Sequence, residues 1–391
     1  MPALVVYGSY VLTPHEAIPD GVVVIEDGKI TAVGHRDEVQ PPAGAENCVA
    51  KDMTIAPGFV DVHIHGAGGK DVMEATTSSL KTVAAMAARH GTTSFVATTV
   101  TAPVEDTLRS LEGIAKYIHA GQTPKAHATP LAEILGIHME GPFISHKRRG
   151  VHPEKSLEKP SIELLEKFLE AADSCVRMLT LAPELPGALE MIDYAVNAGL
   201  VVGMGHTDAT YEQARAAIER GARHAVHVYN AMRPFSHRDP GVLGAVLTDS
   251  EVTTEIIADM VHVAAPAIQL LTAAKKTDHV IAITDGISAT GMGDGRYRLG
   301  NFEVDVERGV CRDADGRLAG STLTMDAALR NLIAMGIPPL EALRMATLYP
   351  ARRLGLAGKK GALAPGADAD LVVLTQDLQV AGVLTCGVGL E

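Results

Sequence analysis

Two histidines in the first third of the chain have the spacing of metal ligands. In residues 56–66 apolar and polar residues alternate, so Asp61, His63 and His65 share one face of the expected strand. Two imidazoles placed two residues apart on one strand face can bind the same metal ion, although a hydrogen-bonded structural pair has the same spacing. The pattern therefore needs support from residues elsewhere in the chain.

Four further residues whose side chains can bind a metal or transfer a proton lie at the ends of other expected strands: Glu140, His206, His227 and Asp285. The carboxylate of Glu140 with the imidazoles of His206 and His227 is a typical ligand set of catalytic zinc or a related divalent ion, which keeps one position open for water. The histidine pair of the first strand could hold a second ion, with Glu140 between the two. Asp285 is a candidate base near the activated water, which would suit hydrolysis of an amide or ester.

The elements that must position these residues alternate between strand and helix patterns. Because repeated alternation of this kind implies a parallel sheet, we expect a (β/α)8 TIM-like barrel, with an open doubly wound sheet as the alternative. In a barrel the ends of the strands meet at one mouth, which brings the six polar residues together. The expected strands are residues 60–64, 92–100, 134–140, 176–182, 200–206, 222–228, 253–257 and 279–284, and the expected helices are 102–120, 161–172, 187–198, 210–221, 266–274, 324–335 and 339–347.

Both chain ends have strand patterns without helical spacing, and Asp27-Gly28 is a hairpin signal between two of these strands. Neither end carries enough apolar residues to form a stable sheet alone, so we expect the two to pair into one small β-sandwich domain. The predicted organisation is a small β domain from residues 1–55 and 358–391, and a catalytic barrel over residues 56–357.

Composition excludes several classes of protein. The chain of 391 residues has a formal net charge of -13, which argues against nucleic acid or an anionic membrane as the main partner. We expect a cytoplasmic protein, since no apolar run reaches transmembrane length, no signal peptide is recognisable and the four cysteines lack paired spacing. Gly-x-Ser-x-Gly is absent, and no Gly-x-Gly-x-x-Gly follows a strand, so serine hydrolases and dinucleotide-binding enzymes have no support.

Basic residues near the expected strand ends indicate an anionic ligand. Residues 229–241 follow His227 directly, and donors there could bind phosphate or carboxylate oxygens. A second basic run, residues 147–149, is interpreted as a solvated face. The candidate donors are Asn230, Arg233, His237, Arg238 and, after a later strand, His262.

Several motifs resemble a known family. Pro-Gly-Phe-Val-Asp-Val-His-Ile-His-Gly at 57–66 resembles the first-strand motif of the amidohydrolase superfamily, and residues 361–374 resemble its return to the small β domain. More specifically, residues 138–143 (His-Met-Glu-Gly-Pro-Phe), 205–208, 227–232 (His-Val-Tyr-Asn-Ala-Met), 284–286 and 318–321 resemble the N-acetylglucosamine-6-phosphate deacetylases. The likeness runs from about residue 27 to residue 374.

This resemblance implies a metal-dependent deacetylase acting on a small phosphosugar, with one or two divalent ions (Zn, Fe, Mn or Co) per subunit. It implies that Glu140, His206 and His227 are metal ligands, joined by His63 and His65 in a two-metal branch, and that Asp285 is the acid/base. Many superfamily members bridge their two metals through a modified lysine after a later strand. The corresponding segment here, Leu181-Ala-Pro-Glu184, contains no lysine, which is consistent with Glu140 as the bridging ligand.

The resemblance also implies a set of substrate contacts. His152 would contact the acetamide carbonyl, and the remaining contacts to sugar and phosphate would come from Val151, Asn230, Ala231, Arg238, His262, Leu318, Ala319 and Gly320. Arg238 would reach the site of a neighbouring subunit, which implies a homodimer. Two alternatives remain open: another amidohydrolase, such as an N-acyl-amino-acid deacylase or a cyclic amidase, and a non-enzymatic metal-binding barrel.

Overall fold

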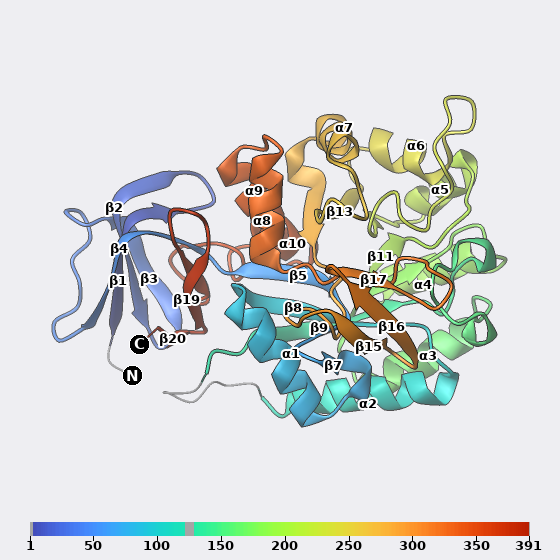
Figure 1. The fold of residues 1–391 in the computed structure, drawn as a ribbon, viewed down its shortest axis with the longest axis horizontal. Coiled ribbons are helices and arrows are strands. Elements are labelled where there is room, and N and C mark those ends of the chain that lie inside the picture. The colour runs from blue at the N-terminus through green and yellow to red at the C-terminus, as the bar shows by residue number, and fades with distance from the viewer. Residues whose placement is uncertain (1–2, 122–128, 391) are drawn as a thin grey trace.

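Two bodies form the molecule, a small sheet and a larger barrel with helices around it (Figure 1). The computed structural model describes residues 3–121 and 129–390. Within those residues, no helix is long and apolar enough to cross a membrane.

Eight parallel strands form the centre of the larger body, in the order β14-β13-β12-β11-β10-β9-β8-β5. Backbone hydrogen bonds close the ring between its first and last strands, from Asp285 N to His63 O (2.9 Å) and from His65 N to Gly286 O (2.8 Å). The predicted barrel is therefore confirmed, and the open sheet is excluded. Its strands are β5 (Phe59–Ile64), β8 (Thr92–Thr99), β9 (Glu133–Glu140), β10 (Val176–Leu181), β11 (Val201–Met204), β12 (His224–Ala225), β13 (Thr253–Ile257) and β14 (Val280–Ile283).

Helices cover the outside of this ring, and the seven predicted from sequence are present within about two residues of their expected ends. Three more were not predicted: α1, α6 and α10. Helix α1 begins with a capping box, in which Thr76 and Ser79 exchange hydrogen bonds between side chain and backbone. The helices are α1 (Thr77–Arg89), α2 (Val104–His119), α3 (Ile162–Ala171), α4 (Ala188–Asn197), α5 (Tyr211–Glu219), α6 (Gly241–Thr248), α7 (Ala265–Lys275), α8 (Met325–Ala334), α9 (Pro339–Ala346) and α10 (Leu348–Arg353).

Both chain ends contribute to one seven-stranded sheet of order β20-β19-β18-β4-β1-β2-β3, as expected for the small β domain. The predicted Asp27-Gly28 turn joins β2 to β3, with both residues at positive φ (48° and 74°) as a tight hairpin requires. Its strands are β1 (Leu4–Leu12), β2 (Ala17–Glu26), β3 (Lys29–His35), β4 (Glu46–Pro57), β18 (Leu371–Leu374), β19 (Val380–Thr385) and β20 (Val388–Gly389).

A buried lysine ties the small sheet to the barrel. Lys360 Nζ lies 2.7 Å from Asp370 Oδ2, 2.9 Å from Asp368 Oδ2 and 2.5 Å from Glu133 Oε2 at the start of β9. The side chain of Lys360 is 2% exposed, so its buried positive charge is stabilised by pairing with these three carboxylates.

A three-stranded antiparallel sheet that the sequence did not predict is inserted after β14. It packs its own apolar cluster, which includes Leu299, Val304 and Val306, against Ile287 and Ala319 near the mouth of the barrel. Its strands are β15 (Gly295–Leu299), β16 (Phe302–Glu307) and β17 (Val310–Arg312).

Candidate metal and catalytic site

One carboxylate lies at the centre of the barrel mouth, and imidazoles from four other segments point at it. Oε1 of Glu140 lies 2.8 Å from His227 Nε2, 3.2 Å from His206 Nε2 and 3.4 Å from His63 Nε2. Oε2 lies 3.3 Å from His65 Nε2. The structure thus brings together all five residues that the sequence assigned as metal ligands.

Hydrogen bonds on the far side of three of these rings set their tautomers. Nδ1 of His65 donates to Thr98 O (3.0 Å), Nδ1 of His206 donates to Arg148 O (3.0 Å), and Nδ1 of His63 donates to the carboxylate of Glu255 (2.8 Å). In a neutral ring the proton on Nδ1 leaves the Nε2 lone pair free. Three Nε2 lone pairs therefore face the Glu140 carboxylate.

Lone pairs that face a carboxylate repel it unless a cation lies between them, so this arrangement fits a bound metal. Nε2 of His63 is fully buried and has no hydrogen-bond partner among the described residues. Where no ion is bound, a proton on His65 Nε2 takes this place: burial lowers the pKa of His65, but hydrogen bonds with Asp285 and Glu140 and their charges outweigh burial and raise the pKa to about 9. The cluster therefore stabilises positive charge, and its imidazole and carboxylate donors suit Zn, Fe, Mn or Co.

His152 belongs to the same cluster but presents the opposite tautomer. The backbone N–H of Thr101 donates to His152 Nδ1 (3.3 Å), so in the neutral ring the proton is on Nε2, which lies 3.4 Å from Glu140 Oε2. Burial and the nearby His206 lower the pKa of His152 to about 4, which keeps the ring neutral. His152 can therefore donate a hydrogen bond into the site, and it is a poor metal ligand.

Asp285 faces the same centre from the end of β14. Its Oδ1 lies 3.2 Å from His65 Nε2 and 3.7 Å from His63 Nε2. Burial raises the pKa of this carboxyl, but the hydrogen bond with His65 and the surrounding imidazoles outweigh burial and lower the pKa below its usual value. Asp285 is therefore ionised and able to accept a proton from a nucleophile.

Strained backbone marks three of these strand ends. His206, His227 and Asp285 have φ values of 45°, 27° and 49°, a region that costs a residue with a side chain about 1 kcal/mol or more. Strain of this kind persists where the surroundings over-determine it, and here it turns the three side chains into the mouth.

A cavity of about 230 Å³ opens above the cluster. Most of the residues that the resemblance assigned to substrate line it, together with four that were not predicted, Val100, Gly150, Leu299 and Arg317. The predicted residues in its lining are His65, Glu140, Val151, His152, His206, His227, Asn230, Ala231, His262, Asp285, Leu318 and Gly320.

His262 lines the cavity and is held by an acidic partner. Its Nδ1 donates to Asp259 Oδ2 over 2.7 Å, and its side chain is 6% exposed. Burial lowers the pKa of His262, but the hydrogen bond and charge of Asp259 outweigh it and raise the pKa. The ring is therefore poised to carry positive charge into the cavity.

Three predicted residues do not line the cavity as the structure describes it. His63 and Ala319 are fully buried behind it. Arg238 lies in the exposed run 234–239 between β12 and α6, away from the cavity lining. The structure therefore does not bring Arg238 into the cavity of its own chain.

Three of the basic residues noted in the sequence are paired with acids. Arg233 donates from Nε to Asp239 Oδ2 over 3.0 Å, so it is not a free anion donor. The interpretation of residues 147–149 as a solvated face is wrong for Arg148, whose Nε donates to Asp208 Oδ1 over 2.7 Å, beside Lys147 Nζ at 2.6 Å from Oδ2. Asp208 thereby ties the loop of Val151 and His152 to the loop after β11.

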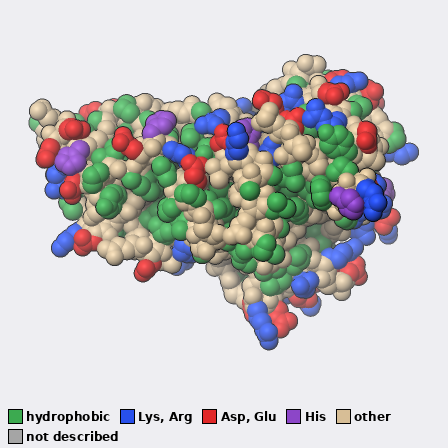
Figure 2. All heavy atoms as spheres, turned by 90° about the horizontal axis from the view of Figure 1, so that it is seen from above, with side chains coloured by type: hydrophobic (Ala, Val, Ile, Leu, Met, Phe, Trp, Pro, Cys, Tyr) green, Lys and Arg blue, Asp and Glu red, His purple; other side chains and the backbone are tan. Residues whose placement is uncertain are grey.

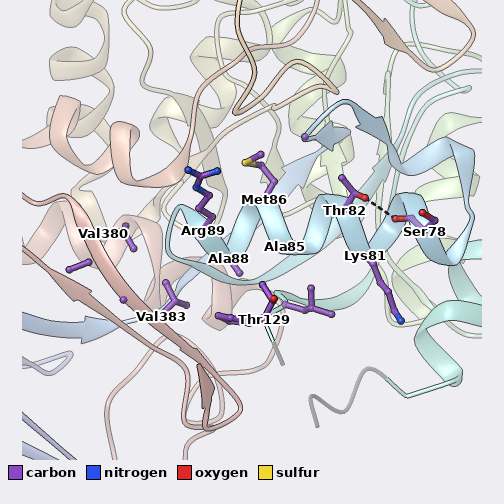
Figure 3. A pocket seen from close by; sticks show the side chains of 15 residues that line it. Ser78, Lys81, Thr82, Ala85, Met86, Ala88, Arg89, Thr129, Val380 and Val383 are labelled. Atoms are coloured by element: carbon purple, nitrogen blue, oxygen red, sulfur yellow. Dashed lines mark hydrogen bonds between the residues drawn. The ribbon is translucent and has the colours of Figure 1, made fainter. Parts of the chain in front are cut away.

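A larger hollow of about 800 Å³ lies elsewhere, between α1 and β19 (Figure 3). The residues that line it include Ser78, Lys81, Met86 and Arg89 of α1 and Val380 and Val383 of β19. The described residues that line it include none of the Glu140 cluster, so its size does not make it the active site. On the face drawn in Figure 2, acidic and basic side chains are mixed.

Two buried residues that touch the cluster were not predicted as part of it. Glu255, in β13, contacts His63, and His138, in β9, has its ring centroid 4.7 Å from that of His63. Glu255 lies within an apolar strand pattern and His138 two residues before the strand end, so neither carried the strand-end signal that marked the other site residues.

Comparison with known proteins gives a consistent result. The model of the amidohydrolase family matches residues 54–388. The N-acetylglucosamine-6-phosphate deacetylase of Vibrio furnissii is 39% identical over 92% of this chain and 88% of its own, and the N-acetylgalactosamine-6-phosphate deacetylase of Escherichia coli O157:H7 is 38% identical over 94% of each. A mutant N-acetyl-D-glucosamine-6-phosphate deacetylase from Mycobacterium smegmatis, solved in complex with N-acetyl-D-glucosamine-6-phosphate, superposes with a TM-score of 0.92 at 40% identity, covering 100% of this chain and 99% of that one.

Proposed function

The chain belongs to the metal-dependent amidohydrolase family, and within it we propose that this enzyme hydrolyses N-acetylglucosamine 6-phosphate to glucosamine 6-phosphate and acetate. The observation that carries the proposal is the Glu140 carboxylate with four imidazole nitrogens directed at it, beside the ionised Asp285, on the floor of a closed barrel mouth. This arrangement suits hydrolysis of an unactivated amide better than any other reaction that these side chains can support.

Glu140, His206 and His227 would hold one divalent ion, and His63 and His65, which also face Glu140, would hold a second. A divalent ion bound there supplies Lewis-acid chemistry, which lowers the pKa of water to about 7 and polarises a carbonyl. Zn, Fe, Mn and Co all suit these ligands.

Asp285 is the acid/base of the reaction. Its carboxylate takes a proton from the attacking water and delivers it to the leaving nitrogen, so that the amine departs neutral. The lowered pKa keeps Asp285 in the form that the first of these transfers requires.

His152 orients the acetyl group. Since Nε2 of the neutral ring carries the proton, it can donate a hydrogen bond to the acetamide oxygen and stabilise the negative charge that develops there. The bond from Thr101 N–H keeps the ring in this tautomer.

The sugar and its phosphate occupy the rest of the cavity. His262 and Asn230 donate to the phosphate, while Val151, Ala231 and the backbone of residues 318–320 contact the sugar. A Cβ on Gly320 would lie 2.4 Å from Ile287 Cγ2 and 3.0 Å from Asp285 O, so only glycine lets this segment pack so closely against the segment of Asp285.

Arg238 completes the phosphate site of a second copy, which makes the active enzyme a homodimer. Its exposed position supports this role. Phe235 in the same exposed run, and Met260 and Val261 in the loop after β13, are exposed apolar side chains (56%, 39% and 43%) of the kind that a subunit interface covers. The catalytic centre of each subunit then depends on its partner for one charge.

The Escherichia coli relative acts by its name on the galactose epimer, so the sugar is the part of the proposal to test first. Acetate release is to be measured side by side with N-acetylglucosamine 6-phosphate, N-acetylgalactosamine 6-phosphate and unphosphorylated N-acetylglucosamine. We expect the highest kcat/KM with the first substrate and the lowest with the last. Preference for the galactose epimer would change the sugar but keep the reaction, whereas no acetate from either phosphosugar would favour another amidohydrolase activity.

A further inference from the structure

Glu255 is a buried carboxylate that the proposed reaction does not use. It lies in β13, is 0% exposed and does not line the cavity. Its Oε2 accepts from His63 Nδ1 (2.8 Å) and from the backbone N–H of His227 (3.2 Å), and its Oε1 lies 2.8 Å from His224 Nε2. A buried charge is costly unless it is paired, so a carboxylate held at this depth calls for an explanation.

This carboxylate crosses the inside of the barrel. His63 belongs to β5, which is separated from β13 by β14 in the ring, while His224 and His227 belong to or follow β12 on the other side. The Glu255 side chain thus contacts both expected metal positions, because it accepts from the ring of His63 at one and from the backbone of His227 at the other.

We propose that Glu255 is a positioning residue that locks His63 in the Nδ1–H tautomer and thereby forms the second metal position. This inference rests on the proposed metal-dependent function. With its Nδ1 proton donated to Glu255, His63 presents the Nε2 lone pair, 3.4 Å from Glu140 Oε1, and that nitrogen has no hydrogen-bond partner in the described part of the chain. A carboxylate behind a metal-binding imidazole also increases the basicity of the ring.

The network behind Glu255 is complete, which argues that its orientation is imposed. His224 lies between Glu255 and Thr253, with its Nδ1 2.7 Å from Thr253 Oγ1, so both nitrogens of this ring are engaged. Glu255 therefore cannot turn away from His63 without leaving His224 unpaired.

Two substitutions separate charge from hydrogen bonding. In Glu255→Gln the amide oxygen can still accept from His63 and His227. Its NH2 group can donate to His224 Nε2 once the His224 proton moves to Nδ1, where Thr253 Oγ1 accepts it, so the hydrogen bonds are kept and the charge is lost. In Glu255→Met the acceptor is lost as well, and the tautomer of His63 is no longer imposed.

Thr180→Val is the matched control. Thr180 Oγ1 pairs with His138 Nε2 over 2.7 Å in the same fully buried layer, but it has no contact with Glu255. The control removes one buried hydrogen bond and should lower stability without changing metal affinity.

The experiment is a titration of chelator-stripped protein with Zn²⁺ against a chromophoric chelator, on the wild type and the three variants. We expect Glu255→Gln to weaken one of two zinc equivalents by about 10- to 100-fold and Glu255→Met to abolish that equivalent, with Thr180→Val unchanged. In a His63→Ala/His65→Ala background, Glu255→Gln should leave the remaining equivalent unchanged.

Unchanged zinc affinity in folded Glu255→Gln and Glu255→Met would overturn the inference, as would an equal loss in Thr180→Val. If Glu255→Met does not fold, ¹⁵N NMR of histidine-labelled wild type loaded with zinc decides: a His63 ring with its proton on Nδ1 supports the inference, and one with its proton on Nε2 contradicts it. A wild type that binds no zinc and releases no acetate would instead overturn the proposed function itself.

Discussion

His227 Nε2 lies 2.8 Å from Glu140 Oε1, although the two residues come from strands three positions apart around the barrel. The same oxygen is 3.2 Å from His206 Nε2. Three side chains from three βα loops thus converge on one point, as a three-ligand metal site requires. Asp285 approaches this point from the end of β14 and His152 from the loop after β9, which places proton transfer and carbonyl recognition around the same atom.

Asp285→Asn tests the acid/base role. The substitution keeps the shape of the side chain but removes its ability to accept a proton, so we expect turnover to fall by at least about a hundredfold while bound metal and Tm are retained. Asp294→Asn is a suitable control, because Asp294 only accepts from the backbone of Arg308 and Gly309 at an exposed turn. Near-native turnover in Asp285→Asn would remove its assignment.

Replacing His63 and His65 together tests whether the two metal positions are unequal. Glu140, His206 and His227 form a complete set without them, so the double alanine variant should lose one metal equivalent and retain measurable activity. Metal analysis of protein purified without chelator checks this. If all bound metal disappears, the primary site has been assigned to the wrong residues.

Arg238→Ala tests the phosphate site and the dimer at once. Loss of a charge-assisted contact costs about 1.5–3 kcal/mol, so kcat/KM for the phosphosugar should fall by roughly ten- to two-hundredfold, mainly through KM. Unphosphorylated N-acetylglucosamine should be hardly affected, and equal losses on both substrates would remove Arg238 from the phosphate site.

Mixed dimers sharpen this prediction. A subunit with Arg238→Ala keeps its own Asp285, and a subunit with Asp285→Asn keeps its own Arg238. Dimers formed from the two variants, after refolding or co-expression, should therefore recover activity above either variant alone. Failure to recover would place Arg238 outside the neighbouring site.

Asp208→Asn tests the anchoring of the loop that carries Val151 and His152. Burial raises the pKa of Asp208, but hydrogen bonds from Lys147 and Arg148 outweigh it and lower the pKa, so the carboxylate is the charged partner of both. We expect kcat/KM to fall by about tenfold, since neutralisation loosens the loop without touching the metal ligands.

Asp239→Asn is the matched control for this loop. It breaks the ion pair between Arg233 and Asp239. Asp239 lies in the exposed run 234–239, and in the described part of the chain no hydrogen bond joins it to the His152 loop. Equal effects of the two substitutions would mean that Asp208 acts through Arg233 and not through the His152 loop.

Much of the site was predictable because parallel strands place their ends together. His63, His65, Glu140, His206, His227 and Asp285 stood at expected strand ends, and closure of the ring brought them to one mouth as predicted. Glu255 was missed for the opposite reason: it lies inside a strand, where a single sequence gives no sign of which partner a buried carboxylate will meet.

Elements that depend on contacts between residues far apart in the chain also could not be predicted from the sequence. The sheet of β15, β16 and β17 is stabilised by contacts such as Val304 with Ala319, which local patterns do not reveal. Likewise, the pairing of Arg148 with Asp208 joins loops after two different strands, so a basic run that resembled a solvated face became an anchor.

The most direct test of the account is acetate release from N-acetylglucosamine 6-phosphate by chelator-stripped protein, before and after the return of Zn²⁺, Fe²⁺, Mn²⁺ or Co²⁺. The account predicts that stripped protein is folded but inactive, and that at least one of these ions restores turnover in the wild type, but not in a variant with His206→Ala and His227→Ala. Full activity in protein shown to contain no metal, or restoration in that double variant, would contradict it.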